Sequence, residues 1–275
     1  MLASFLLSLR EGIEAALIIG VVLGALRKMR HMELAPAIWY GAISAVLVSL
    51  IGGVVLTAFG LSLEGTAEQI FEGAAILLAA GVLTWMIFWM SRQARNIKGE
   101  LENNVHKAAF DGGKRGLFAL AFLAVVREGI ELALFLTAAT FASDMQSTIL
   151  GALLGLGFAI LLGWGLFAST IRLDLRRFFQ VTGFLLILFA AGLVAHGVHE
   201  FNEARLIPSV IEHVWDVNPI LDENTTLGSM LKALFGYNGN PSLTEVFSYF
   251  LYFLAIFFGL RLSERRAGAR VQPLA

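Results

Sequence analysis

Long apolar stretches separated by shorter polar segments dominate the pattern of hydrophobic and polar positions along the chain. Each stretch is close to the ~20 residues that an α-helix needs to cross the hydrocarbon core of a bilayer. The pattern therefore predicts an all-α integral membrane protein with seven transmembrane helices. These are expected at about residues 2–26, 36–60, 69–90, 116–142, 147–169, 178–199 and 244–262.

The composition supports this fold class, since 57% of the 275 residues are hydrophobic and only 15% are charged. Such a chain is too apolar for a soluble globular domain of this length. The chain has no cysteine, so disulfides, thiolate metal sites and cysteine nucleophiles are excluded. The first apolar stretch has no basic region before it and contains Arg10, Glu11 and Glu14. We therefore expect a permanent helix there rather than a cleaved signal peptide.

Lysine and arginine residues gather in alternate connections of the seven-helix pattern. Most of the 20 basic residues lie in the segments 27–30, 92–115, 172–177 and 261–270. Because basic loops resist translocation, this bias predicts an extracytoplasmic N-terminus and a cytoplasmic C-terminus. Acidic residues dominate the opposite connections, above all the long one at about 200–243. An outer face of that sign would attract cations.

The chain also contains an internal repeat of three helices. The pentapeptide REGIE occurs at 10–14 and at 127–131, GAISAVLVSLIGG resembles GALLGLGFAILLG, and ILLAAGVL resembles ILFAAGLV. A unit of three helices crosses a membrane an odd number of times, so its second copy has inverted topology, as in many transporters. We expect one transmembrane domain, 1–275, with four consecutive parts. These are repeat one at about 1–92, repeat two at about 115–200, a periplasmic connection at about 200–243 and helix seven at about 244–262.

Each REGIE motif places one arginine and two glutamates near the middle of an apolar helix. Residues three and four apart share a helix face, so the two glutamates point the same way and the arginine can pair with the second. A charge at the bilayer centre costs ~2.5 to 3.5 kcal/mol on insertion scales. We therefore expect the motif residues to face the interior of the protein. They are Arg10, Glu11, Glu14, Arg127, Glu128 and Glu131.

The charge of the two motifs indicates a cargo. Four glutamates and two arginines sum to a net charge of −2. That charge is unfavourable in an interior of low dielectric constant, but it would suit a bound multivalent cation. Carboxylate oxygens favour hard cations such as Fe(III), Mn(II), Mg(II) or Ca(II). The alternative is that each motif is a self-neutralising pair that fixes helix packing. The predicted metal ligands are Glu11, Glu14, Glu128 and Glu131, with Arg10 and Arg127 as supporting charges.

Two further groups of polar residues lie near the expected outer surface. Glu72 lies inside the apolar run of the third helix, where we expect a role in metal entry. The sixth helix ends in a stripe at helical spacing that would suit a metal ion, although a solvated helix end explains it about as well. The stripe consists of His196, His199, Glu200 and Glu203. Trp85 and Trp89 fit interfacial anchoring.

Two REGxE pentapeptides in the first and fourth of seven helices resemble the motif of the oxidase-dependent iron permease family. The segments FEGAAILLAAGVLTWMIFWM, AAGLVAHGVHEFNEA and LFGYNG are similar to those of its bacterial members, so the likeness covers nearly the whole chain. The resemblance implies import of iron, as Fe(III), across the inner membrane of a bacterium. It also implies an extracytoplasmic oxidase or periplasmic iron-handling proteins as partners. The translocation ligands that it implies are Glu11, Glu14, Glu128 and Glu131.

The residues alone leave other functions open. A carrier of another hard divalent metal, or a proton-coupled carrier of an organic cation, could use the same carboxylates. A non-transporting membrane assembly subunit could use them as structural ion pairs. The sequence has no nucleophile constellation, ATP-binding loop or organic cofactor motif. We therefore expect neither an enzyme nor a nucleic-acid partner, and we expect the membrane potential, an ion gradient or a partner to drive transport.

Overall fold

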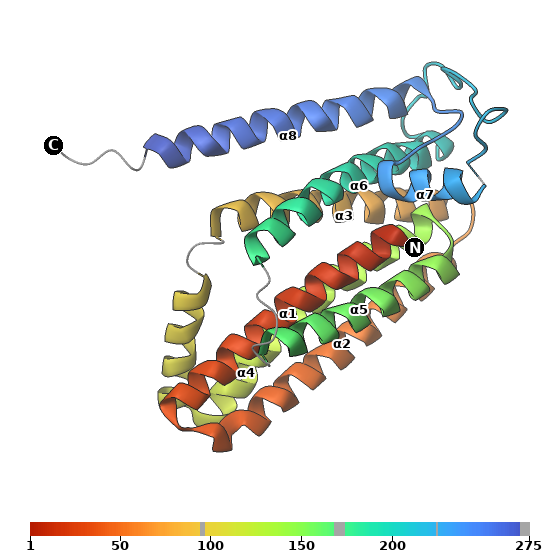
Figure 1. Ribbon diagram of the computed structural model, residues 1–275. Coiled ribbons are helices and arrows are strands. Elements are labelled where there is room, and N and C mark those ends of the chain that lie inside the picture. Colours follow the sequence, from red (N-terminus) through yellow and green to blue (C-terminus); the bar gives the residue numbers. More distant parts are fainter. Residues whose placement is uncertain (94–96, 168–173, 224, 270–275) are drawn as a thin grey trace.

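A computed structural model describes residues 1–275 apart from 94–96, 168–173, 224 and 270–275 (Figure 1). All regular secondary structure in these described residues is helical, which confirms the all-α class. The elements are α1 (Leu2–Met29), the 3-10 turn η1 (Met32–Leu34), α2 (Ala35–Leu61), α3 (Thr66–Gln93), α4 (Ile97–Ala142), α5 (Met145–Phe167), α6 (Leu175–Glu203), α7 (Thr226–Phe235) and α8 (Leu243–Ala269). Of the basic residues in the predicted cytoplasmic segments, Arg95, Arg172 and Arg270 lie outside the described residues.

Several of these helices are long and apolar enough to cross a membrane. These spans are Met32–Leu61, Thr66–Trp89, Met145–Gly165, Arg177–Glu203 and Leu243–Leu262. The two other predicted spans are also helical, as α1 and the part of α4 after Gly113, and each carries one REGIE motif. These two helices differ from the five apolar spans because each contains the three charged residues of a REGIE motif. The length and apolar composition of these helices therefore indicate a multi-pass membrane protein.

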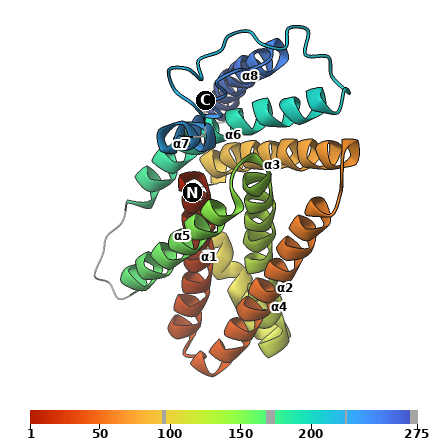
Figure 2. The ribbon, with the colours of Figure 1, turned by 90° about the vertical axis from the view of Figure 1, so that its right-hand side faces the viewer.

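The helices form two layers (Figures 1 and 2). One layer contains α1, α2, α4 and α5, and the other contains α3, α6 and α8. In the first layer α1 and α4 contact each other, and each is covered by one further helix, α5 on α1 and α2 on α4. In the second layer α6 contacts both α3 and α8, and the layers meet through α4 with α3 and α1 with α6. The two motif-bearing helices therefore lie at the centre of the molecule.

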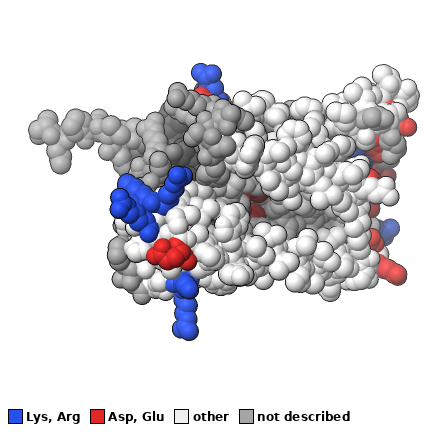
Figure 3. Space-filling view, turned by 60° about the horizontal axis from the view of Figure 1, so that its bottom comes forward, with Lys and Arg blue, Asp and Glu red and all other residues white. Residues whose placement is uncertain are grey.

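Charged residues lie at the two ends of the helix bundle. Figure 3 shows Lys and Arg mostly at one end, Asp and Glu mostly at the other, and a wide uncharged surface between them. Large apolar side chains of α2 and α5 are exposed in this band, among them Leu50, Val54, Leu153 and Leu161. Lipid is the environment that covers such a surface favourably.

Two connections contain more helix than the apolar pattern predicts. α4 begins at Ile97, well before its apolar part, and its helical geometry is interrupted at Gly113 (φ 53°, ψ −133°). Glycine accepts this backbone conformation because it has no Cβ. The long connection after α6 contains α7, which starts where the Thr225 hydroxyl accepts a hydrogen bond from Gly228 N at 3.1 Å. α7 lies at the same end of the molecule as the N-terminus (Figure 1).

Candidate functional site

Glu11 on α1 and Glu128 and Glu131 on α4 form a buried group that we call the central acids. One carboxylate oxygen of each lies within 4.8 Å of the others. In the described part of the chain, this is the one group of three such side chains close enough to share a metal ion. The spacing of three residues places Glu128 and Glu131 on one face of α4, and all three residues are buried.

The motif arginines pair with the second glutamate of their own motif. Arg10 Nε donates to Glu14 Oε1 at 3.1 Å, and Arg127 Nε donates to Glu131 Oε1 at 3.1 Å. Glu14 is mostly buried on Arg10 and lies outside the central acids. Of the four glutamates predicted as ligands, three meet at one centre and Glu14 lies outside it, while Glu14 and Glu131 are each held by the guanidinium of their own motif.

The two guanidinium groups leave some buried carboxylate oxygens without a partner. Both oxygens of Glu11 and Oε2 of Glu131 are inaccessible to solvent and meet no hydrogen-bond donor among the described residues. The side chain within hydrogen-bonding reach of Glu11 is a second acid, Glu128, and two carboxylates attract each other only when a proton or another cation lies between them. An unpaired buried polar atom costs about 1–3 kcal/mol, and more when it is charged. Self-neutralising ion pairs do not account for these atoms. A cation between α1 and α4 would satisfy them, and a set of carboxylate oxygens suits a hard cation.

The glycine of each motif lets a neighbouring helix approach closely. A Cβ built on Gly12 would lie 2.6 Å from Cβ of Ala159 on α5, and one built on Gly129 would lie 2.6 Å from Cβ of Ser49 on α2. Side chains cannot pack at that distance, so a larger residue would push the neighbouring helix away. These glycines therefore allow α5 to pack closely on α1, and α2 on α4, next to the central acids.

The two motif arginines have different surroundings. Arg10 is 2% exposed, and its Nη1 has no hydrogen-bond partner in the part of the chain that the structure describes. The Arg127 side chain is 40% exposed, and its Cζ lies 4.6 Å from the ring centroid of Trp89 and 5.8 Å from that of Trp85. Such distances are typical of cation–π contacts. The two tryptophans, for which the sequence indicates interfacial anchoring, therefore also contact the second motif.

A cavity of about 500 Å³ lies between α1, α2, α4 and α5, and Glu11 and Glu128 are among the residues that line it. Most of the other lining residues are apolar, such as Val54 on α2 and Leu153 on α5. Figure 3 shows a hollow in the uncharged band on the side where α2 and α5 run. This side of the central acids is therefore lined mainly by apolar side chains.

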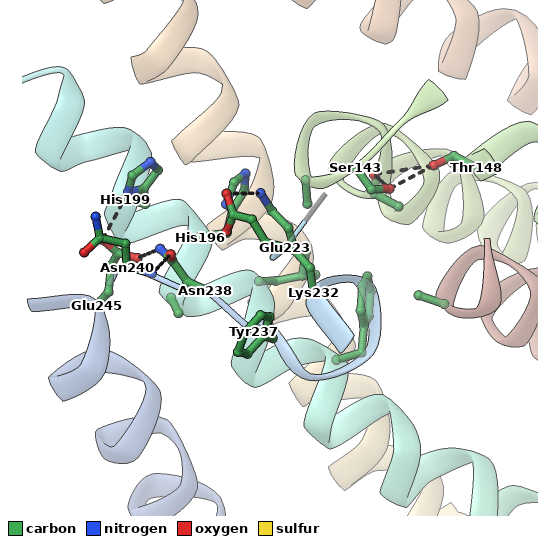
Figure 4. Close-up of a pocket in the computed structure, with 18 of the residues that line it drawn as sticks. Ser143, Thr148, His196, His199, Glu223, Lys232, Tyr237, Asn238, Asn240 and Glu245 are labelled. Atoms are coloured by element: carbon green, nitrogen blue, oxygen red, sulfur yellow. Dashed lines mark hydrogen bonds and ion pairs between the residues drawn. The ribbon is translucent and has the colours of Figure 1, made fainter. Parts of the chain in front are cut away.

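A second cavity of about 330 Å³, which we call the vestibule, lies at the end of the molecule that carries the N-terminus. It is bounded by the start of α1, the ends of α4 and α6, and the connection that contains α7. Figure 4 shows His196 and His199 of α6 beside Asn238 and Glu245 at this cavity. The vestibule therefore combines imidazole, amide and carboxylate groups in one place.

The structure places the predicted stripe of α6 beside the vestibule. His199 Nε2 lies 3.2 Å from Glu203 Oε1, and His196 Nε2 lies 3.5 Å from Glu200 Oε1. Glu72 on α3 interacts electrostatically with Glu200 and Glu203. All five predicted outer residues therefore gather at one end of the molecule, away from the central acids.

Glu245 on α8 is a member of this outer group that the sequence pattern does not reveal. Its Oε1 lies 3.0 Å from His199 Nδ1. In the sequence it is an acid in the first turn of an apolar helix, which is usual because acids favour helix N-termini. Only the packing of α8 on α6 brings it to the histidine.

Helices of spanning length, an uncharged surface band and a buried group of acids define a multi-pass membrane protein with ionisable residues in its interior, a feature that marks ion pathways. The family model of the iron permease FTR1 family matches residues 1–270. The chain therefore belongs to the iron permease FTR1 family.

Relatives of known name extend over almost the whole chain. The ferrous iron permeases EfeU of Shigella sonnei (strain Ss046) and of Escherichia coli O157:H7 are each 35% identical to it over 272 residues, which cover 98% of this chain and 98% of the relative. The ferrous iron permease EfeU of Yersinia pestis is 34% identical over 257 residues, which cover 92% of this chain and 91% of the relative. No solved structure matches the chain.

Replacing Gly129 with valine should destabilise the protein by about 1–3 kcal/mol, the usual cost of overpacking a close contact. Gly52→Val on α2 is the matched control, because no atom of the described residues lies within 4 Å of a Cβ built there. Thermal unfolding of the two purified variants in the same detergent measures the difference. Equal melting temperatures would contradict the conclusion that Gly129 is needed for the close packing of α4 on α2.

Proposed function

We propose that this protein is an iron permease that imports iron across the inner membrane, with the central acids as its translocation site. Membership of the FTR1 family supports iron as the substrate, as do relatives named iron permeases. The observation that carries the assignment of the site is the set of buried oxygens on Glu11 and Glu131 that no donor group satisfies. Glu14, Arg10 and Arg127 adjust the charge around the ion.

We further propose seven transmembrane helices, in which α1 and residues 116–142 of α4 join the five apolar spans. In this topology the N-terminus is outside and the C-terminus is cytoplasmic. The basic end of the molecule in Figure 3 is the end at which α1 finishes and α2 begins. Lys and Arg favour the cytoplasmic side, which supports this orientation.

Contacts between helices support an inverted repeat at about 1–92 and 115–200. If α1, α2 and α3 correspond to α4, α5 and α6, the packing of α1 on α5 corresponds to that of α4 on α2. The motif glycines agree, since Gly12 meets Ala159 and Gly129 meets Ser49. Ser49 and Ala159 occupy the same position of GAISAVLVSLIGG and GALLGLGFAILLG.

An apolar layer separates the vestibule from the central acids. On α1, Leu7 lies between Ser4, which lines the vestibule, and Glu11. Phe135 has the equivalent place on α4, one helical turn after Glu131. Both apolar side chains are fully buried and belong to one cluster. We propose that transport opens this layer by movement of the two repeats against each other, as in other carriers built from inverted repeats.

We propose that iron is delivered to the protein at its outer end, beside the vestibule. An acidic outer surface raises the local concentration of cations, and the vestibule offers an entrance beside it. Periplasmic iron-handling proteins would hand Fe(II) over there, and this takes the place of the oxidase that the family resemblance implies. The membrane potential, an ion gradient or the chemistry of such a partner would drive the ion inward.

Neutralising any of the central acids should lower iron uptake at least tenfold, because loss of even an outer-shell partner commonly costs 10–100-fold in metal affinity. The variants are Glu11→Gln, Glu128→Gln and Glu131→Gln, which remove charge and keep volume. Glu64→Gln, at an exposed outer position, is the control. Its rate of iron uptake should stay within twofold of the rate of the unmodified protein. Initial rates in proteoliposomes of the pure protein measure this. If all three variants transport like the control, the proposed site is wrong, and no uptake by the unmodified protein would indicate a non-transporting subunit.

We propose that the transported ion is Fe(II), in place of the Fe(III) that the family resemblance implies. The relatives are named ferrous iron permeases, and an ion must bind weakly enough to leave its site. Three carboxylates would hold a trivalent ion more tightly than a divalent one. Proteoliposomes should therefore take up Fe(II) kept reduced by ascorbate faster than Fe(III) citrate. Faster uptake of Fe(III) would support the Fe(III) that the family resemblance implies. If excess Mg(II) inhibited the uptake of Fe(II) as strongly as excess Fe(II) itself, a general carrier of divalent metals would be favoured.

The absence of cysteine from the sequence allows the topology to be tested with single cysteines. Ser62→Cys and Met32→Cys, both exposed at opposite ends of α2, should differ in labelling by a membrane-impermeant maleimide. We expect labelling of intact spheroplasts at position 62 and labelling at position 32 only after permeabilisation. The reverse pattern would invert the proposed orientation.

A further inference from the structure

The C-terminal end of α7 lies inside the outer half of the helix bundle. A Cβ built on Gly192 of α6 would lie 2.6 Å from the backbone nitrogen of Gly236, the C-cap of α7. Gly192 comes eleven residues before Glu203, the last residue of α6. At 1.5 Å per residue, the end of α7 therefore lies about 16 Å below the outer end of α6. The connection that the apolar pattern predicts as periplasmic thus reaches well inside the membrane span of α6.

The chain after α7 returns to the outer end within a few residues. Asn202, next to the end of α6, donates hydrogen bonds from Nδ2 to Ser242 Oγ and to Thr244 Oγ1, both at 2.9 Å. Between Gly236 and Ser242 the chain therefore rises from the level of Gly192 to that of Asn202. This is a rise of about 15 Å along α6. Six residues of extended chain span up to about 20 Å, so the return needs a nearly extended segment.

The returning segment, residues 236–242, is not helical. Non-helical backbone is tolerated at membrane depth only where protein buries it or where it lines a water-filled cavity. Gly236, Tyr237 and Asn238 line the vestibule, and Figure 4 shows the last two beside it. The Tyr237 hydroxyl also donates a hydrogen bond to Leu221 O at 2.7 Å, which fixes the turn to the connection before α7. The vestibule therefore provides the polar space that this backbone requires.

α7 has one side toward the protein and one side away from it. It contacts α1 and α6, and Figures 1 and 2 show it beside the outer part of α6, next to the N-terminus of α1. Leu227 and Met230 share a helix face, and both side chains are exposed. Lipid covers such apolar side chains favourably. α7 therefore separates the polar vestibule from the bilayer where α1 and α6 meet.

We propose that α7 is a re-entrant helix, which enters the membrane from outside and forms one wall of the vestibule, and that Gly192 and Gly236 position it. The role of α7 rests on the proposed function, since it keeps a water-filled path open for iron. Phe189 and Leu193 line the vestibule and belong to the cluster that forms the apolar layer. An ion that enters the vestibule thus meets this layer next, and the central acids lie beyond it.

Spin labels on single cysteines measure how deep α7 lies in the bilayer of proteoliposomes. The labelled variants are Leu227→Cys and Met230→Cys on α7 and Ile220→Cys in the exposed connection before it. The ratio of oxygen accessibility to nickel-chelate accessibility rises with depth. We expect it to rise from position 220 to 227 and again to 230, because three helical residues add about 4.5 Å of depth. Equal ratios at 227 and 230 would indicate a helix on the membrane surface, and nickel-dominated values like that at 220 would indicate a helix in water. Either result would overturn the proposal.

Gly192→Ala tests whether the contact between the two glycines positions α7. The new Cβ would press on the backbone of Gly236, and overpacking of this kind forces backbone shifts. We expect the ratio at position 230 to fall to about that at position 227, and the rate of iron uptake to fall with it. Gly183→Ala, on the same helix, is the matched control, because no atom of the described residues lies within 4 Å of a Cβ built there. It should change neither quantity.

A label at Leu153→Cys, which is exposed on α5, should keep its ratio in both alanine variants if the first layer stays folded. An unchanged depth of position 230 in Gly192→Ala would show that the glycines do not position α7. A changed depth with normal uptake would remove α7 from the path of iron. Because depth is measured without transport, a surface position of α7 and a failure of the central acids to carry iron would be seen separately.

Discussion

Carboxylates that are buried between α1 and α4 with too few partners are the constraint on which the rest of the structure depends. Each charge near the membrane centre costs ~2.5 to 3.5 kcal/mol, and the two arginines offset only part of that cost. Arg10 and Arg127 bind Glu14 and Glu131, while neither oxygen of Glu11 meets a hydrogen-bond donor in the described structure. A fold that keeps such a group must gain from it elsewhere, and in the proposed function that gain is the binding of a passing cation.

The packing of the first layer explains how such a group could open and close. Beyond the motifs, Gly53 of α2 packs against Ala133 of α4, and Gly163 of α5 packs against Ala16 of α1, again at positions that the proposed repeat aligns. Close contacts of this kind make two rigid pairs, α1 with α5 and α4 with α2. Glu11 belongs to one pair and the other central acids belong to the second. Movement between the pairs would therefore change the distance between ligands without distorting either pair.

Much of this arrangement could be predicted from periodicity, and the remainder depends on contacts between distant segments. Apolar runs of about 20 residues predict the helices, and the spacing within REGIE predicts which acids share a face. The spacing does not show that Glu14 lies outside the group of three acids whose oxygens come within 4.8 Å of one another, because that depends on how α1 packs against α4. Glu245 and the contact of Arg127 with Trp89 could not be predicted, since no local pattern shows which helices become neighbours. The helix before Gly113 was hidden by its polar composition.

Anomalous diffraction from crystals soaked in Fe(II) without oxygen tests the central claim most directly. The account predicts an iron peak between α1 and α4, at about 2.0–2.2 Å from carboxylate oxygens of Glu11, Glu128 and Glu131. A structure with no iron there, in which these carboxylates turn wholly onto Arg10 and Arg127, would contradict it.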